Sequence, residues 1–240
     1  RSGKWQVRGS DGLVMAGALS LLMGLYCFFL PHTPPAHKAG AAVPFVQALS
    51  MLSDLNFLVF LVIAFVVSTQ LQFYFLGTSR FLEDIGTPHS AIPAHMSIAQ
   101  IAQVIAMACI LPVLFPKLGY QWTLAIATCM WMAMFLAYAL LRRRSLVIAS
   151  MAFHGLAFAF FFDAAFIYVN RVAPPEIRGS AQALYTTVTL GLGLFVGTQI
   201  TGVVMDRFRG ESGFLWRPIF LVPCTLLAVC AFAFICFFKG

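Results

Sequence analysis

The polar side chains that could bind a ligand lie within long apolar runs of the sequence. Ser97, Gln100 and Gln103 recur at every third position, so neighbouring members stand about 60° apart on one helix face. Thr69 and Gln72 share a face in the same way. Amide side chains both donate and accept hydrogen bonds, which suits a neutral polar ligand. The alternative is that these side chains hydrogen-bond neighbouring helices to one another.

Two ionisable residues stand deep in one apolar run and could carry protons. His154 and Asp163 are nine residues apart, which on a helix puts them on opposite sides and roughly 13 Å apart. We therefore expect no direct contact, and expect Asp163 to pair with a basic or polar group nearer the membrane edge. Phe158, one turn from His154, could stack on a ring-shaped ligand. The alternative for His154 is a core histidine bonded to a neighbouring helix.

The sequence contains no enzyme motif that we recognise. HExxH, the P-loop and GxSxG are all absent, and the six cysteines lie singly in apolar runs. We therefore predict that the protein is not an enzyme, has no catalytic residues, and needs no metal or cofactor.

The composition indicates a membrane protein. Hydrophobic residues make up 61% of the 240, charged residues 10%, and the mean hydropathy is +0.90. Soluble domains carry about 25% charged residues. Because backbone groups in lipid must be satisfied within each segment, we predict an all-α polytopic membrane protein. The net charge of +7 comes from basic residues at the ends of apolar segments, which argues against nucleic-acid binding.

Seven stretches are long and apolar enough to span a bilayer. They are Gly12–Leu30, Leu55–Leu76, Ile92–Phe115, Trp122–Leu141, Leu146–Tyr168, Ser180–Met205 and Pro218–Phe238. Pro116–Gly119 predicts a short turn between the third and fourth, and Val43–Asp54 predicts an interfacial linker helix. Gly193 and Gly197 form a GxxxG pair, which favours close helix packing.

Several blocks of this sequence resemble the nucleoside:proton symporters of the major facilitator superfamily. The most specific block is Ala173–Gln182, with its Ile-Arg-x-Ser-Ala-Gln core. The others are Leu30–Pro35, Met96–Gln103 with Leu111–Pro112, and His154–Phe158. The resemblance extends over essentially the whole chain.

The resemblance implies that the seven spans are helices six to twelve of a twelve-helix transporter. Residues 1–30 would then be the last helix of an amino-terminal bundle whose first five helices are missing. Residues 31–54 would be a cytoplasmic central linker, and residues 55–240 a six-helix carboxy-terminal bundle. The positive charges indicate the opposite orientation. Ten of the fifteen Lys and Arg lie in loops on the same side of the membrane as residue 1, and positive loops are typical of the cytoplasmic side. We give the resemblance more weight, because orientation depends largely on early helices.

The resemblance also implies roles for individual residues. The positions that line the family's nucleoside site are Gln72, Gln100, Gln103, His154 and Phe158. Within the matching blocks and the glycine-rich continuation, Arg178, Gln182, Gly193 and Gly197 are candidates for structural or gating roles. His154 and Asp163 are the candidates for proton coupling.

Two departures from the family pattern bear on that coupling. Gln103 and Ala159 stand where some family members have acids. Gln103 cannot titrate, so His154 would have to carry the proton in their place, and exchange without protons stays open.

The sequence therefore predicts part of a secondary transporter that takes up nucleosides by alternating access in the inner membrane. The missing amino-terminal bundle would be required for transport. The alternatives are a transporter of another polar solute and a seven-helix receptor. A retinal protein needs a lysine in its last span, and Ile219–Phe238 has none.

Overall fold

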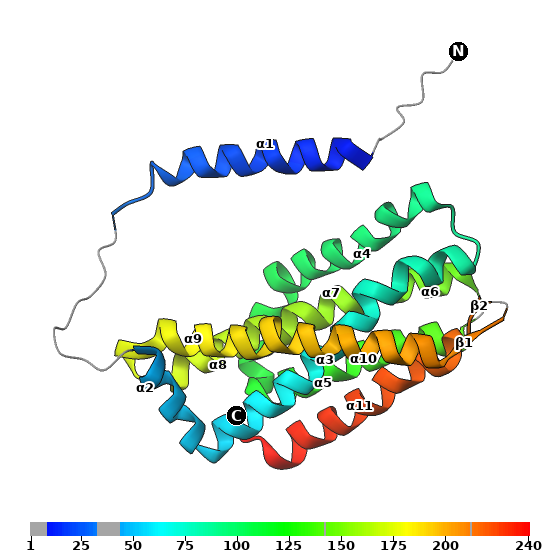
Figure 1. Ribbon diagram of the computed structural model, residues 1–240. Helices are drawn as coiled ribbons and strands as arrows, with labels where there is room; N and C mark the ends of the chain where they lie inside the picture. The colour runs from blue at the N-terminus through cyan, green and yellow to red at the C-terminus, as the bar shows by residue number, and fades with distance from the viewer. Residues whose placement is uncertain (1–8, 33–43, 142, 212) are drawn as a thin grey trace. The chain divides into compact units, whose positions relative to one another are not determined.

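The computed structural model describes residues 9–32, 44–141, 143–211 and 213–240, and these residues are almost entirely helical (Figure 1). The α-helices are α1 Gly9–Cys27, α2 Pro44–Ser50, α3 Leu55–Asp84, α4 Ile92–Ile105, α5 Leu111–Leu140, α6 Arg144–Ser150, α7 Ala152–Phe158, α8 Ala164–Val172, α9 Arg178–Thr186, α10 Leu194–Arg207 and α11 Trp216–Phe237. Short 3-10 turns occupy Met51–Ser53, His89–Ala91 and Pro175–Ile177. Strands β1 Arg209–Gly210 and β2 Gly213–Phe214 pair as a short antiparallel hairpin.

Five helical runs in the described residues are long and apolar enough to cross a membrane. They are Leu55–Asp84, His89–Leu140, Arg144–Val172, Pro175–Arg207 and Trp216–Phe237, with Asp11–Cys27 as a shorter apolar helix. The run His89–Leu140 has 52 residues, and a straight helix of that length would measure about 78 Å, far more than the bilayer core of about 30 Å.

A break inside α5 divides this long run into two shorter helices. Gly119 has φ 68° and ψ −177°, a conformation that favours glycine and interrupts the helix. The turn predicted at Pro116–Gly119 is therefore present, and the predicted third and fourth spans lie on either side of it. The prediction of an all-α polytopic protein is confirmed.

Three spans contain a π-helical segment: Ala106–Ile110 before α5, Ala159–Asp163 between α7 and α8, and Thr187–Gly193 between α9 and α10. The sequence did not predict these segments. For the first, Pro112 offers a cause, because it has no N–H to donate to the preceding turn.

Residues up to 41 form one unit and residues from 42 onward form a second. In the second unit α11 packs along α5 and α3, α10 along α3, and α4 along α7 (Figure 1). Large aromatic rings fill the core between these helices. The fully buried rings are Trp131, Tyr74, Tyr185, Phe57, Phe60, Phe73, Phe135, Phe160, Phe161, Phe162, Phe220 and Phe234.

The linker predicted at residues 31–54 is described in part, because positions 33–43 lie outside the described residues. Helix α2 and the turn Met51–Ser53 form its second half, and α2 contacts α9. Asp54 then caps α3, since its Oδ1 accepts a hydrogen bond of 2.8 Å from the Phe57 N–H. The division of the chain into three parts stays a prediction.

Candidate functional site

His154 lies at the centre of an aromatic cluster contributed by α3, α5 and α7. Its side chain is 3% exposed, and its Nδ1 accepts a hydrogen bond of 3.2 Å from the indole N–H of Trp131 on α5. Tyr74 on α3 stacks on the imidazole at 3.7 Å with an angle of 15° between the rings. Phe75 and Phe158 approach it at 5.8 and 6.2 Å. Because Nδ1 accepts, the neutral imidazole carries its proton on Nε2.

Helix α4 crosses α7 immediately beside this histidine. A Cβ built on Gly155 would collide with the Ala99 carbonyl oxygen and lie 2.7 Å from the Gln103 backbone nitrogen. Only glycine therefore allows the two helices to approach this closely. The crossing brings the backbone of Gln103 next to the residue that follows His154, so these two predicted site residues belong to one helix contact.

The side-chain amides of Gln100 and Gln103 on α4 are available for hydrogen bonding. Gln100 is exposed and Gln103 half-buried, and in the described part of the chain neither amide forms a hydrogen bond. Ser97 is also exposed, but its hydroxyl donates to the Ala94 carbonyl at 2.8 Å. The two amides can therefore bind a polar ligand without first breaking an internal hydrogen bond.

On α3, Gln72 is half-buried and, within the described ranges, forms no hydrogen bond. The neighbouring Gln70 is 1% exposed, and its Nε2 donates 2.6 Å to the Thr69 hydroxyl. Thr69 thus belongs to a buried local hydrogen-bond group, whereas the Gln72 amide remains available.

The GxxxG pair packs against α3 near these residues. A Cβ on Gly193 would lie 2.9 Å from the Ser68 Cβ, and one on Gly197 would collide with the Thr69 carbonyl oxygen. The glycines therefore set the approach of α10 and the preceding π-helical segment to α3.

Asp163 is the last residue of the π-helical segment Ala159–Asp163, and in the described residues no hydrogen bond or ion pair joins its side chain to His154. Asp163 lines a hollow of about 500 Å³ whose other walls are apolar: Met107, Leu111, Pro112, Phe115, Phe166 and Ile167. Its Oδ2 is buried and has no hydrogen-bond partner among the described residues. The Tyr185 hydroxyl is near enough to interact with its charge, but in the described residues neither it nor a basic group pairs with this oxygen.

Arg178 and Gln182 lie on α9, away from the aromatic cluster. Arg178 is exposed at the first residue of the helix and Gln182 is half-buried. The Gln182 carbonyl accepts a hydrogen bond of 2.9 Å from the Thr186 hydroxyl. The structure does not bring these two residues together with the glutamines of α4.

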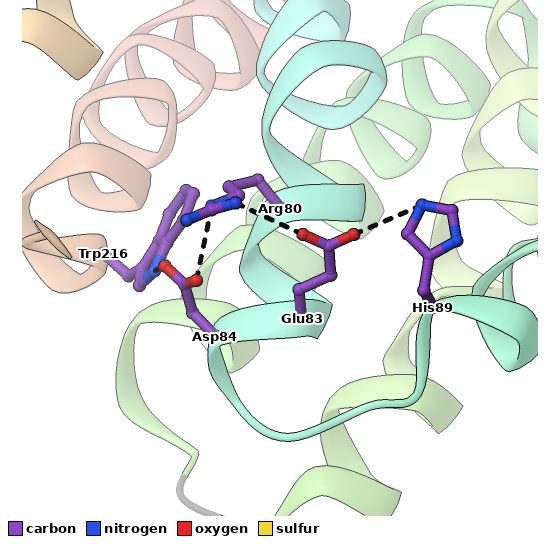
Figure 2. Close-up of polar contacts among 5 residues, drawn as sticks. All are labelled: Arg80, Glu83, Asp84, His89 and Trp216. Carbon is purple, nitrogen blue, oxygen red and sulfur yellow. Dashed lines mark hydrogen bonds and ion pairs between the residues drawn. The ribbon is translucent and has the colours of Figure 1, made fainter.

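A second polar cluster joins the end of α3 to α11 and to the turn His89–Ala91 (Figure 2). Arg80 contacts Glu83 and Asp84 at 3.4 Å each, His89 Nε2 lies 3.5 Å from Glu83 Oε1, and the Trp216 indole donates 3.0 Å to Asp84. Arg80 and His89 are exposed, and such surface ion pairs contribute about 0–1 kcal/mol each. We interpret this cluster as structural.

The sequence pattern does not predict the contacts that Tyr74 and Trp131 make with His154. Trp131 offered a usable signal, because an indole N–H in the middle of an apolar span needs an acceptor. Tyr74 gave no such signal, since its stacking partner is 80 positions away. Among the described residues no group of His, Cys, Asp and Glu could hold a metal ion.

The fold is that of a polytopic helical membrane protein with polar side chains inside its spans. The chain superposes on the solved nucleoside transporter NupG with a TM-score of 0.73, and on an aspartate-to-alanine mutant of it with 0.76. Sequence identity is 24% for both, over 94% of this chain and 60% of the solved one. At this identity the likeness shows the fold alone.

The model of the nucleoside H+ symporter family matches residues 8–240, and the chain belongs to this family. The putative nucleoside transporter YegT of Escherichia coli is 27% identical over 95% of the chain, and the nucleoside permease NupG of the same organism 26%. Its xanthosine permease is 26% identical over 88%. The chain spans 56%, 58% and 54% of these relatives' lengths. The predicted family is confirmed, and membership of a transporter family agrees with the prediction that the chain is not an enzyme.

Proposed function

We propose that this chain is the carboxy-terminal part of a secondary active transporter that takes up nucleosides by alternating access, coupled to protons. The family match over residues 8–240 carries this proposal. The names of the relatives add to it, since they are a putative nucleoside transporter, a nucleoside permease and a xanthosine permease. The cell's inner membrane is the proposed location.

Amides and one aromatic ring form the proposed nucleoside site. Gln72, Gln100 and Gln103 are free to hydrogen-bond ribose hydroxyls and the edges of the base. Phe158 is half-buried one turn from His154, and its ring would stack on the base. His154 contributes through Nε2, because Trp131 occupies Nδ1 and Tyr74 covers one face of the ring.

His154 and Asp163 are the proposed proton carriers. His154 could take up a proton only at Nδ1, and only when the Trp131 hydrogen bond opens. A carboxyl group takes up a proton when its surroundings disfavour charge. Asp163 fits this description, since its Oδ2 is buried beside an apolar hollow without a partner in the described residues. Asp163 also lies one helical turn beyond Ala159, where some family members have an acid.

Movement of α10 against α3 is the proposed structural basis of alternation. At Gly197 the nearest neighbour is the Thr69 backbone, and at Gly193 it is the small Ser68 side chain, a close approach that favours sliding. Arg178 and Gln182 belong to the segment that begins this span and are proposed as gating positions. The amino-terminal bundle of the longer relatives would supply the other wall of the cavity, so we propose that transport requires it.

Substitution of Gln100 by Ala in the full-length protein tests the substrate site. Loss of one hydrogen bond corresponds to about 0.5–1.5 kcal/mol, so we expect the KM for uridine to rise by about two- to tenfold. Gln199→Ala is the matched control, because Gln199 is an exposed amide on α10 outside the proposed site. If Gln100→Ala leaves uridine and adenosine uptake unchanged, the Gln100 amide does not bind nucleosides.

A further inference from the structure

A pocket of about 450 Å³ lies at the end of the bundle where α3 begins and α8 and α11 end. The break at Gly119 in α5 forms part of its wall. Figure 1 shows α2 and the end of α11 at this same end of the bundle. The pocket is built from residues of the second unit alone and lies apart from the proposed nucleoside site.

Two cations line this pocket, Arg171 on α8 and Lys239 just after α11. In the described ranges of the chain, the ion pairs all involve Arg80 or His89, so neither pocket cation has a carboxylate oxygen within 4.0 Å. The Arg171 guanidinium stands over the Tyr120 ring, with its Cζ 5.8 Å from the ring centroid. This cation–π contact orients the guanidinium, whose N–H groups can still donate hydrogen bonds to an anion.

Asn56 fixes the other side of the pocket. Its Oδ1 accepts from the Lys239 backbone N–H at 2.8 Å, and its Nδ2 donates to the Lys239 carbonyl at 2.8 Å and to the Tyr168 hydroxyl at 3.1 Å. Because Tyr168 accepts this hydrogen bond, its own O–H proton remains free to donate. The backbone that carries Lys239 and the Tyr168 hydroxyl are thus held in place by one amide.

Asp54 is the one acidic side chain that lines the pocket. Its Oδ1 already accepts the hydrogen bond from the Phe57 N–H that caps α3. Part of its charge therefore interacts with the positive end of the α3 helix dipole. The arginine, the lysine and the tyrosine hydroxyl together form a set of donors suited to an oxyanion.

We propose that this pocket binds a phosphate group, carried by an anionic phospholipid headgroup or by a soluble phosphate. Arg and Lys are the side chains that recognise phosphate in proteins, and basic pockets between membrane helices bind lipid headgroups. The pocket lies where three spans begin or end, which is the depth of the headgroups. This site is separate from nucleoside binding and does not depend on it.

The test uses the full-length protein, with the amino-terminal half restored, purified in detergent. Retention of phosphatidylglycerol is measured by native mass spectrometry, with diacylglycerol as the probe that lacks phosphate. Binding of inorganic phosphate and glycerol 3-phosphate, neither of which carries a nucleoside, is measured by calorimetry. We expect one of these phosphate-bearing probes to bind saturably, and the arm that responds identifies whether the source is lipid or soluble.

The double substitution Arg171→Gln with Lys239→Gln is expected to weaken that binding at least tenfold. The exchange Arg171→Lys with Lys239→Arg keeps both charges and should retain binding, and Lys117→Gln, an exposed lysine outside the pocket, is the matched control. The proposal is overturned if no phosphate-bearing probe binds the wild type, if diacylglycerol binds as well, or if the Gln double variant binds equally. Should the double variant fail to fold, the single variants Arg171→Gln and Lys239→Gln are measured in its place, and wild-type binding by both would overturn the proposal.

Discussion

The indole N–H of Trp131 donates a 3.2 Å hydrogen bond to Nδ1 of His154, and both side chains are almost completely buried. Indole nitrogen can only donate, so this contact requires an unprotonated Nδ1. It fixes the orientation of the ring and leaves the Nε2–H as a donor to a ligand, whereas uptake of a proton at Nδ1 would require this hydrogen bond to open. The contact therefore joins the packing of α5 on α7 to the chemistry of the proposed site.

Trp131→Phe removes this donor and leaves a buried acceptor unpaired. Hydrogen bonds between membrane helices contribute about 0.5–2 kcal/mol, so we expect the free energy of unfolding to fall by that amount. Urea or SDS unfolding in detergent measures it, and a double-mutant cycle with His154→Phe isolates the pair. Trp122→Phe, at a 50% exposed position, is the control. A coupling energy of zero would show that the hydrogen bond contributes nothing.

Gly155→Ala tests the crossing of α4 and α7. The added Cβ collides with the Ala99 carbonyl oxygen, so the helices must move apart. Overpacking of this kind costs about 1–3 kcal/mol, and we expect reduced stability and reduced uptake together. Gly202→Ala is the matched control, since a Cβ there meets nothing within 4 Å. Equal stability of the two variants would contradict the close approach.

Asp163→Asn tests proton coupling at the apolar hollow. If this carboxyl carries the proton, wild-type uptake rises as external pH falls, whereas the variant takes up nucleoside at a rate independent of pH and still exchanges it. Radiolabelled uptake and counterflow in cells measure both properties of the full-length protein. Asp206→Asn, an exposed acid at the end of α10, should behave as wild type. An unaltered pH profile in Asp163→Asn would leave His154 as the remaining candidate.

The positions of the spans could be predicted from the sequence because hydropathy and helix breakers are local signals. Pro116–Gly119 marked the turn inside the long run, and Gly119 does break α5. The family could be predicted from short blocks such as Ala173–Gln182. Both kinds of signal depend on residues that lie close together in the chain.

The surroundings of the candidate site could not be predicted in the same way. The stack of Tyr74 on His154 joins residues on two helices, and nothing in the local pattern of either helix specifies it. The π-helical segment Ala159–Asp163 also escaped prediction, although it alters the angle between His154 and Asp163 that a regular helix would give. Long-range packing determines both features.

The most direct measurement of the central claim is uridine and adenosine uptake by cells expressing the full-length protein, with and without a proton gradient. We expect saturable uptake that collapses when the gradient is removed, and no uptake by the 240-residue chain alone. Uptake that persists without the gradient would contradict proton coupling and leave a nucleoside carrier. Absence of uptake of either nucleoside would contradict the proposed function itself.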